Sequence, residues 1–219
     1  MLKPIFEDWG LIDYEQALQR QLERVETVSQ DQNHPGFLIF CTHPAVVTTG
    51  RQTLPEDVFA WQGPVVEVSR GGRATYHGPS QLVVYPILNL KSERQGRGPQ
   101  EVRGYLRALE LAIVETLKEF GITAVGKTPQ KLPGQQAESE ETGVWVNDKK
   151  IASLGIAVKK WITFHGAAIN LVNDPAAFHG MNPCGFKSNV MISVEQLLGK
   201  PVQSAAFAHQ LRTHLFELL

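Results

Sequence analysis

The chain has 219 residues, 42% of them hydrophobic and 20% charged, which are ordinary values for a globular protein. Its formal net charge of -1 excludes the basic overall charge that nucleic-acid-binding domains carry. No apolar run reaches the roughly 20 residues that span a bilayer, and Met1–Gly10 lacks the pattern of a signal peptide. We therefore expect a cytoplasmic protein with no nucleic-acid or membrane partner.

The first half of the chain predicts one helix and several strands. Asp13 is followed by Gln16 at the spacing of a capping box, and apolar residues then recur at helical spacing to about Gln30. A glycine-containing loop is expected over 70–80. Runs rich in apolar and β-branched residues predict strands over 36–41, 45–49, 64–69 and 82–90.

The second half predicts a long helix, a polar loop, three strands and a helical end. The helix over 99–120 begins with proline and has Gly121 just beyond its end. Residues 125–142 are polar and contain proline and glycine, so they predict a mobile loop. Asn147-Asp148 predicts a hairpin turn between the first two strands. The expected strands and terminal helices cover 143–146, 150–158, 161–172, 194–198 and 205–219.

The order of these elements predicts an α/β (α+β) fold with a mixed, largely antiparallel sheet flanked by helices. Strands arrive in consecutive runs and do not alternate with helices, which disfavours a doubly wound parallel sheet. We expect residues 1–219 to form a single domain. An arrangement in which residues from about 185 form a small C-terminal lobe stays open.

The two cysteines, Cys41 and Cys184, do not suggest a disulfide framework in a chain of this length. Cys41 ends an apolar run, where burial raises the pKa of a thiol, so we expect it to be structural. Cys184 lies between Pro183 and Gly185, outside any periodic segment, and its thiol can sit at a loop tip. Such a thiol is a candidate nucleophile, especially near a cation, although a buried inert cysteine is the alternative.

Three further segments contain candidate residues. The sequence RGGRATYHGPSQ over 70–81 combines glycines that permit close backbone approach with charged and hydrogen-bonding side chains. It lacks the Lys-Ser or Lys-Thr of a P-loop, and a tight connection with surface arginines is the alternative. Lys150 precedes an apolar strand, where a solvated lysine is the ordinary expectation. His165 precedes small residues that let a ligand approach, and it is either a base or a structural histidine. No cluster has the spacing of a zinc site.

Several blocks in consistent order resemble the lipoyl(octanoyl) transferase family. Residues 70–90 resemble its RGG-x-x-TYHGPGQ-L-x-x-YPI-L block, and residues 143–171 resemble its GVWV…KIA-x-G-I…HG-x-A-x-N block. Residues 43–51 are similar to an earlier block, and 182–185 supply the cysteine. Ser80 stands where the family pattern has glycine, and serine disfavours positive φ.

The resemblance implies the fold of biotin and lipoate protein ligases and of class II aminoacyl-tRNA synthetase catalytic domains. It implies an acyltransferase that moves an octanoyl or lipoyl group from acyl carrier protein to a lysine of a lipoyl domain, the first step of protein lipoylation. Acceptors would be lipoyl domains of 2-oxoacid dehydrogenase subunits and the glycine cleavage H protein. The resemblance implies a monomer without a cofactor or metal.

The resemblance also implies roles for individual residues. Cys184 would carry the acyl-thioester, with Lys150 as its charge partner or base and His165 as an auxiliary group. Backbone N–H groups near Cys184, together with His77, would stabilise an oxyanion. We also expect a basic surface for the acidic carrier from Arg51, Arg70, Arg73, Lys159 and Lys160, with an ordinary solvated surface charge as the alternative for each. Substrate binding would fall to Arg70, Gly71, Gly72, Arg73, Ala74, Thr75, Tyr76, His77, Ser153, Leu154, Gly155, Gly166, Ala167 and Ala168.

Other functions compatible with the same sequence are an ATP-dependent lipoate or biotin ligase, a non-catalytic acyl-chain binding protein, and an amidotransferase between two protein lysines. A ligase would activate a free acid as an adenylate and would need no cysteine. A binding protein would hold the acyl chain without forming a thioester. The amidotransferase would take its octanoyl group from another protein instead of a carrier.

Overall fold

A seven-stranded sheet forms the centre of the structure, a computed structural model that describes residues 3–92, 98–128 and 141–219. Within these residues every neighbouring pair of strands in the sheet is antiparallel except the first, which is parallel. The predicted mixed, largely antiparallel sheet is therefore confirmed. The strands in spatial order are β1 (Ile5–Leu11), β2 (Phe37–Thr42), β6 (Gln81–Ile87), β10 (Ile162–Asn170), β9 (Lys149–Lys159), β8 (Gly143–Val146) and β7 (Val125–Gly126).

A second, three-stranded sheet lies beside the first and brings the glycine-containing segment against it. Its strands are β4 (Val65–Glu67), β3 (Val46–Thr49) and β5 (Thr75–His77), in that order. The prediction of a continuous loop over 70–80 is wrong at β5, which pairs antiparallel with β3 and is fully buried. The sequence does not predict β1 either, because this edge strand has mostly exposed or half-buried side chains without a clear alternation.

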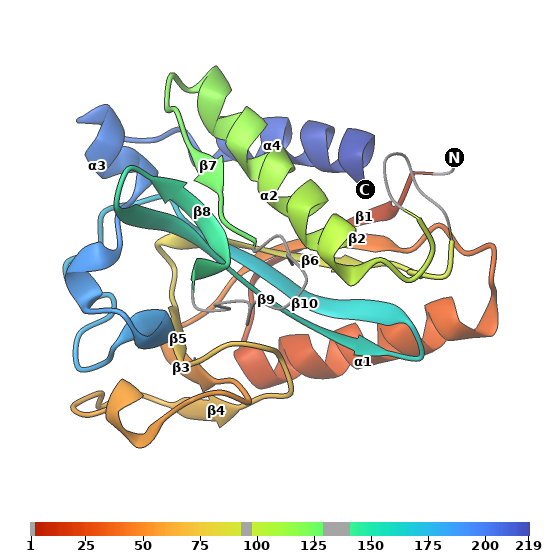
Figure 1. Ribbon diagram of the computed structural model, residues 1–219, viewed down its shortest axis with the longest axis horizontal. Coiled ribbons are helices and arrows are strands. Elements are labelled where there is room, and N and C mark those ends of the chain that lie inside the picture. Colours follow the sequence, from red (N-terminus) through yellow and green to blue (C-terminus); the bar gives the residue numbers. More distant parts are fainter. Residues whose placement is uncertain (1–2, 93–97, 129–140) are drawn as a thin grey trace, which may run out of the picture.

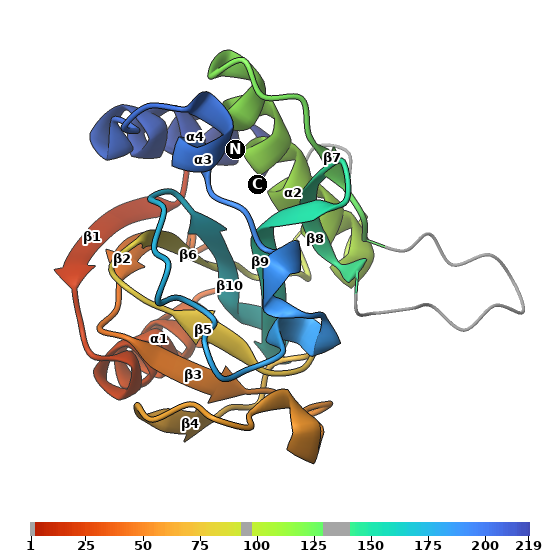
Figure 2. The same cartoon turned by 90° about the vertical axis from the view of Figure 1, so that its left-hand side faces the viewer.

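Helices cover both faces of the large sheet (Figure 1). Helix α1 (Tyr14–Gln30) lies on one face, while α2 (Val102–Glu119) and α4 (Ser204–Leu218) pack together on the other. Figure 2 shows the same layers from the side, with α3 (Val194–Leu198) next to α4. The 3-10 helices η1 (Pro55–Asp57), η3 (Pro183–Gly185) and η4 (Ser188–Val190) lie in connections.

Local signals account for the start of α1 but not for that of α2. The Asp13 carboxylate accepts the N–H groups of Glu15 and Gln16 and so caps α1 as expected. Helix α2 begins later than predicted, at Val102, because Gln100 has a φ of 60° and separates the preceding proline from the helix. A left-handed residue at that point cannot continue a right-handed helix.

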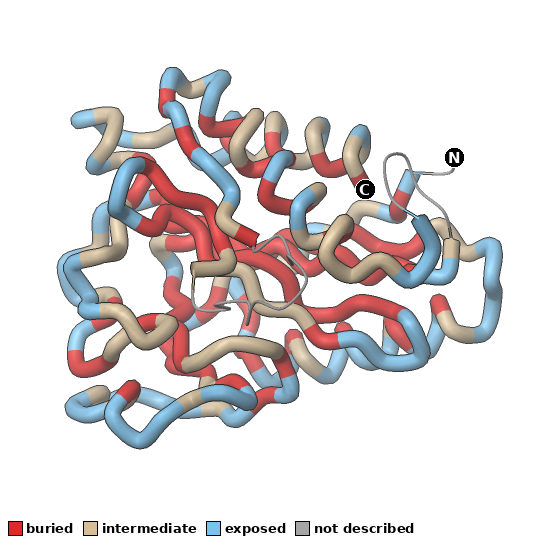
Figure 3. The backbone as a smooth tube through the Cα atoms, viewed as in Figure 1, coloured by how far each residue is buried: buried red, intermediate tan, exposed pale blue. Residues whose placement is uncertain are grey.

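Each face of the sheet has its own apolar core, visible as the red inner tube of Figure 3. On the α2 and α4 face, Ile113 of α2 and Leu211 of α4 share a cluster with Ile169 of β10. On the α1 face, Val25 packs with Val83 and other strand residues. Helix α4 therefore shares a core with α2 and the sheet, although it follows residue 185 in the chain.

Two turns bear directly on the predictions. Asn147 has a φ of 52° between β8 and β9, which confirms the expected hairpin. Ser80 is not among the described residues with positive φ, so serine is compatible with the backbone there. Its hydroxyl donates to Asp174 Oδ2 at 3.3 Å.

The expected mobile loop over 125–142 contains β7, and its central part, 129–140, lies outside the described residues. Within the described parts of the chain, none of the helices combines the length and apolar character that a bilayer crossing requires.

Candidate active site

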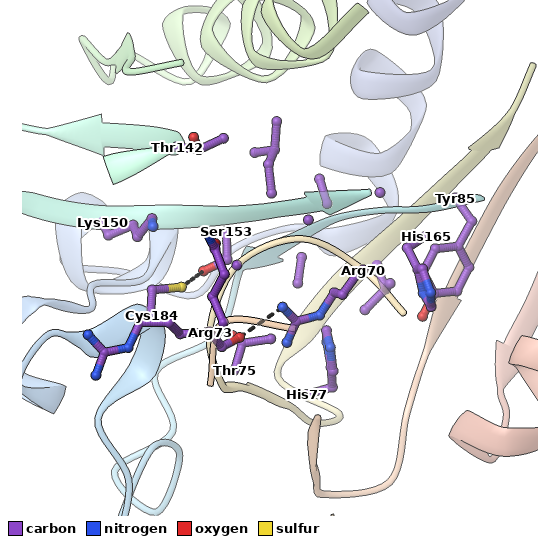
Figure 4. A pocket seen from close by; sticks show the side chains of 18 of the residues that line it. Arg70, Arg73, Thr75, His77, Tyr85, Thr142, Lys150, Ser153, His165 and Cys184 are labelled. Atoms are coloured by element: carbon purple, nitrogen blue, oxygen red, sulfur yellow. Dashed lines mark hydrogen bonds between the residues drawn. The ribbon is translucent and has the colours of Figure 1, made fainter. Parts of the chain in front are cut away.

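A pocket opens where β5, β9, β10 and the η3 turn meet, and it encloses about 590 Å³ of empty space, including its open mouth. Cys184 and Lys150 lie at one end of it in Figure 4, and His165 and Tyr85 lie at the other. The lining contains these predicted site residues: Arg70, Gly72, Arg73, Thr75, His77, Lys150, Ser153, Leu154, Gly155, His165, Gly166, Ala167, Ala168 and Cys184.

The η3 turn holds the Cys184 thiol at the pocket. Cys184 adopts a left-handed conformation, with φ 55° and ψ 26°, and its N–H donates to the carbonyl of Ala74 at 2.8 Å. Gly185 also has positive φ, and a Cβ there would collide with the Arg73 guanidinium. Cys184 is a partly exposed residue, and its Sγ lies 3.9 Å from Ser153 Oγ. A loop cysteine accessible from a pocket fits the nucleophile hypothesis better than the inert alternative.

Lys150 is buried, with 1% of its surface exposed, so the ordinary expectation of a solvated lysine is wrong. Its Nζ lies 5.3 Å from the centre of the Trp145 ring and 5.6 Å from that of Phe186, which follows the η3 turn. Aromatic faces attract a cation and partly replace its lost hydration. The fold therefore holds an ammonium group in the same pocket as the Cys184 thiol.

Arg70 places a second buried cation in the lining. Its guanidinium donates to the carbonyls of Gly71, Arg73 and Thr48 at 3.0, 2.8 and 3.0 Å, and to Thr48 Oγ1 at 2.8 Å. All of these acceptors are neutral, and burial lowers the pKa of Arg70, while Cys184 lies within reach of its charge. Among the described residues no aspartate or glutamate lines the pocket. A pocket with this charge balance favours a thiolate or an oxyanion.

Arg73 supports the η3 turn. Its guanidinium bonds the fully buried carboxylate of Asp57, with Nε–Oδ2 at 2.9 Å, and the ion pair joins η1 to the segment before β5. The backbone carbonyl of Asp57 also accepts the N–H of Asn182, just before the turn. A buried ion pair with two hydrogen bonds fixes the relative position of the segments it joins.

The predicted basic surface does not form as expected. Arg70 is buried and the Arg73 side chain is only 13% exposed, so neither presents its charge to a partner. Lys160 pairs with Glu26 at 3.0 Å, which offsets its charge. Arg51 and Lys159 are exposed. The two arginines lie inside because the small sheet folds the glycine-containing segment against the large one.

The histidines around the pocket are neutral. Burial lowers the pKa of His77 well below its ordinary value and lowers the pKa of His165 to about 3. An imidazole with so low a pKa is a weak base. His165 is therefore better suited to hydrogen bonding than to general base catalysis.

The backbone N–H groups of the η3 turn are already bonded. Those of Cys184, Gly185 and Phe186 donate to the carbonyls of Ala74, Asn182 and Pro183. They do not serve as oxyanion donors in this conformation, contrary to our expectation. The cationic side chains of Lys150 and Arg70 line the same pocket and would stabilise an oxyanion by their charge, since the terminal N–H groups of Arg70 are themselves already bonded.

Three predicted binding residues support the pocket from outside its lining. The N–H of Gly71 donates to the carbonyl of Ile156 at 3.0 Å, and the carbonyl of Ala74 accepts from Cys184. The Tyr76 hydroxyl points away, toward Asp174 Oδ2 at 3.4 Å, and its ring packs on Trp61 and Phe178.

Among the residues that the structure describes, five that line the pocket are not predicted from the sequence: Tyr14, Gln52, Val83, Tyr85 and Thr142. Tyr14 occupies an apolar position of a helix, and it enters the pocket only because α1 packs on the sheet. Val83 and Tyr85 lie on the same side of β6, which is buried on both faces. Because neither face of the strand is polar, the sequence pattern does not indicate which face borders the pocket.

Comparison with known proteins identifies the family. Residues 13–216 match the lipoyl protein ligase A/B catalytic domain. An octanoyltransferase from Bdellovibrio bacteriovorus is 56% identical over 216 residues, which cover 98% of each chain. One from Geobacter metallireducens is 37% identical over 195 residues, or 89% of this chain and 84% of the relative.

Solved structures with little sequence identity share the fold. A lipoate-protein ligase A bound with ATP aligns over 98% of this chain and 83% of its own, with a TM-score of 0.67 and 15% identity. Biotin protein ligase from Aquifex aeolicus aligns over 98% and 68%, with a TM-score of 0.53 and 14% identity. These likenesses confirm the expected ligase-type fold, and the sequence matches show that the chain belongs to the octanoyltransferase family within the lipoyl protein ligase A/B catalytic domains.

Proposed function

We propose that the chain transfers an octanoyl group from octanoyl-acyl carrier protein to a lysine of a lipoyl domain, by way of an acyl-thioester on Cys184. The observation that carries the proposal is a partly exposed cysteine and a buried lysine in one pocket whose described lining has no carboxylate. Relatives named octanoyltransferase, at 56% and 37% identity, support the reaction class.

In the first half-reaction the Cys184 thiolate attacks the carbonyl carbon of the carrier thioester. The bond from carbon to the carrier's sulfur then breaks, and the Lys150 ammonium gives its proton to the departing thiolate. The charges of Lys150 and Arg70 stabilise both the attacking thiolate and the tetrahedral oxyanion. Cys184 is left as a thioester beside a neutral lysine.

In the second half-reaction the amine of the acceptor lysine attacks the Cys184 thioester. The neutral Lys150 takes a proton from the attacking nitrogen, and Cys184 leaves as a thiolate. Lys150 is thereby charged again, so its two roles alternate and protons balance over the cycle. Thioester exchange is nearly isoenergetic and amide formation is downhill, so the transfer needs no ATP.

Small residues on β9 and β10 form the wall along which the acyl chain would lie. Gly155 pairs with Gly166, and a Cβ on Gly155 would come within 3.0 Å of the Arg70 side chain. Ala168, which lies on the same face of β10 as Gly166, continues this wall. Burying each methylene of an acyl chain contributes about 0.8 kcal/mol.

The test uses octanoyl-carrier protein without ATP, followed by intact mass spectrometry. We expect the wild type to gain one octanoyl group and to pass it to a lipoyl domain. Cys184→Ala should gain none and lose at least roughly a thousandfold in transfer rate, the scale on which removal of a nucleophile acts. Cys41→Ala, which removes a thiol that is buried in the core, is the matched control.

The competing functions give different outcomes in the same assay. ATP-dependent transfer from free octanoate would identify a ligase, and acyl binding without a mass shift would identify a binding protein. Transfer only from an octanoylated protein would identify an amidotransferase. Comparing a 2-oxoacid dehydrogenase lipoyl domain with a glycine cleavage H protein would establish the acceptor.

A further inference from the structure

Glu110 on α2 has a buried carboxylate that the proposed mechanism does not use, and only 3% of the residue is exposed. Its Oε1 accepts the N–H of Gly143 at 3.0 Å, and its Oε2 accepts the N–H of Thr128 at 3.1 Å. Gly143 is the first residue of β8, and Thr128 lies just beyond β7. A carboxylate is costly to bury, and hydrogen bonds to both oxygens offset that cost. Glu110 therefore ties the β7–β8 edge of the large sheet to α2.

The Glu110 side chain continues the hydrogen-bond row along this edge. The carbonyl of Gly143 accepts the N–H of Lys127 at 3.0 Å, which extends the antiparallel pairing of β7 with β8. The N–H and carbonyl of one strand residue point to the same side, so the Gly143 N–H faces the Glu110 carboxylate beyond that pair. A Cβ on Gly126 would come within 2.7 Å of Glu110 Oε2, so the backbone of β7 packs directly on the side chain. The start of β8 is thereby fixed against α2, which packs on both strands (Figure 2).

A β-bulge places Lys150 in the pocket. Gly143 of β8 pairs with Ser153 of β9, and Trp145 pairs with Lys150, so β9 has one residue more than β8 between the two pairs. Lys150 and Ser153 are three positions apart and would face opposite sides of a regular strand. With the extra residue, Ile151, buried in the core on the α2 side, both of them line the pocket. The position of Lys150 therefore depends on its pairing with β8.

The start of β8 also touches the Lys150 side chain. A Cβ on Gly143 would come within 2.7 Å of Lys150 Cε, so the lysine stem lies directly on the Gly143 backbone. Trp145, two residues further along β8, provides one of the rings near Nζ. Thr142, which precedes Gly143, lines the pocket, and Figure 4 shows it at the same end as Lys150. Gly143 thus bonds Glu110 through its N–H and contacts Lys150 through its Cα side.

We propose that Glu110 is a positioning residue for Lys150. By bonding the N–H groups of Gly143 and Thr128, its carboxylate fixes the part of β8 on which the lysine stem lies, and so holds the ammonium in place relative to the Cys184 thiol. The role rests on the proposed function, which makes Lys150 the charge partner of Cys184. Two N–H donors need two acceptor atoms, which a carboxylate supplies and an amide does not.

The first experiment measures the rate of Cys184 alkylation by iodoacetamide against pH. Glu110→Gln keeps the length of the side chain but has one acceptor oxygen, so it should slow alkylation at neutral pH about threefold and move the curve toward higher pH. Glu110→Ala loses both bonds and should slow it about fivefold, because a displaced ammonium favours the thiolate less. Wild-type curves in both variants would overturn the proposal.

A double-mutant cycle tests whether Glu110 acts through Lys150. In a Lys150→Ala background, Glu110→Gln should cause no further slowing, because no ammonium is left to displace. Slowing by the same factor as in the wild-type background would show an effect independent of Lys150 and would overturn the positioning role.

Thr116→Val is the matched control for a loosened helix. Thr116 is a fully buried residue of α2 whose hydroxyl donates to the carbonyl of Ala112 at 2.7 Å, within the helix. The variant should lower the free energy of unfolding and leave the alkylation curve unchanged. A shift as large as that of Glu110→Gln would mean that any weakening of α2 displaces Lys150, which would also overturn the proposal.

Amide hydrogen exchange of the wild type keeps the test independent of whether the variants fold. The Gly143 N–H should exchange slowly, because it is bonded to a buried carboxylate. Exchange as fast as in the exposed turn at Asp148 would overturn the proposal.

Failure of the proposed function would give a different result, since alkylation and exchange need neither carrier nor acceptor. If octanoyl-carrier protein does not acylate Cys184 in the wild type but the cycle is non-additive, the proposed transfer fails and the positioning of Lys150 by Glu110 stands. Normal acylation with unchanged alkylation curves in both Glu110 variants would instead defeat the positioning role alone.

Discussion

Lys150 is a buried ammonium held against two aromatic rings and sharing a pocket with a thiol. Burying a cation costs free energy unless charged or polar groups in the site offset the loss of hydration. Arg70, whose hydrogen bonds to described residues all go to neutral acceptors, adds a second buried charge. In the proposed reaction, first the Cys184 thiolate and then the tetrahedral oxyanion would offset the positive charges of Lys150 and Arg70.

Replacing Lys150 by alanine should slow alkylation of Cys184 by iodoacetamide at neutral pH by about tenfold, because a close cation favours the thiolate. The alkylation rate can be followed by intact mass spectrometry. Lys159→Ala, which removes an exposed lysine from the same strand, should leave the rate unchanged. An unaltered rate in Lys150→Ala, with unaltered transfer, would remove Lys150 from the mechanism.

At the scale of elements, the η3 turn is held by neighbouring segments in addition to its own backbone hydrogen bonds. Cys184 and Gly185 both have positive φ, and the Ala74 carbonyl bonds the turn from one side. Arg73, anchored by its ion pair with Asp57, packs against Gly185 from the other. The position of the thiol therefore depends on three segments that are distant in sequence.

Gly185→Ala should reduce the rate of Cys184 acylation at least roughly tenfold and destabilise the fold by about 1–3 kcal/mol, since the new Cβ meets Arg73 and the φ of 80° disfavours alanine. Gly199→Ala is the matched control, because Gly199 also has positive φ but meets nothing within 4 Å. It should cost about 1 kcal/mol and leave acylation intact. Urea unfolding and acyl-enzyme mass would separate the effects, and similar acylation in the two variants would refute the proposed role of the turn.

At the scale of the whole molecule, helices cover both faces of the large sheet, and three histidines, His43, His77 and His165, are buried. Burial lowers the pKa values of His43, His77 and His165, the last to about 3. In the unfolded chain each would titrate at about 6.5. Acid therefore protonates the unfolded state first.

Stability should fall as the pH drops below about 6.5, and the loss contributed by His165 should continue down to about pH 3. Each such histidine contributes about 1.4 kcal/mol per pH unit within its window, because the unfolded state binds the proton and the folded state does not. Urea unfolding at about pH 7 and at about pH 5, above and below the histidine pKa of the unfolded chain, measures how steeply the free energy of unfolding depends on pH. The control His209→Gln, at an exposed position, should show the same pH dependence as the wild type. A free energy of unfolding that does not change with pH would contradict the burial of three neutral histidine rings.

Local chemistry accounts for the features that are predictable from the sequence. Asp13 begins α1 because its carboxylate reaches the first N–H groups, and Asn147 makes the hairpin turn because its backbone tolerates positive φ. Cys184, between proline and glycine, is recognisable as a loop thiol for similar reasons. Each signal depends on a few neighbouring residues and can therefore be recognised in the sequence by itself.

Only the tertiary structure decided the surroundings of these residues. It buried Lys150, drew Arg70 and Arg73 inward, paired β5 with β3, and brought Tyr14 from α1 into the pocket. It also gave His165 a positive φ inside β10, which no periodicity predicts. These outcomes depend on contacts between segments far apart in the chain, whose free energy comes from packing and burial and leaves no pattern in the local sequence.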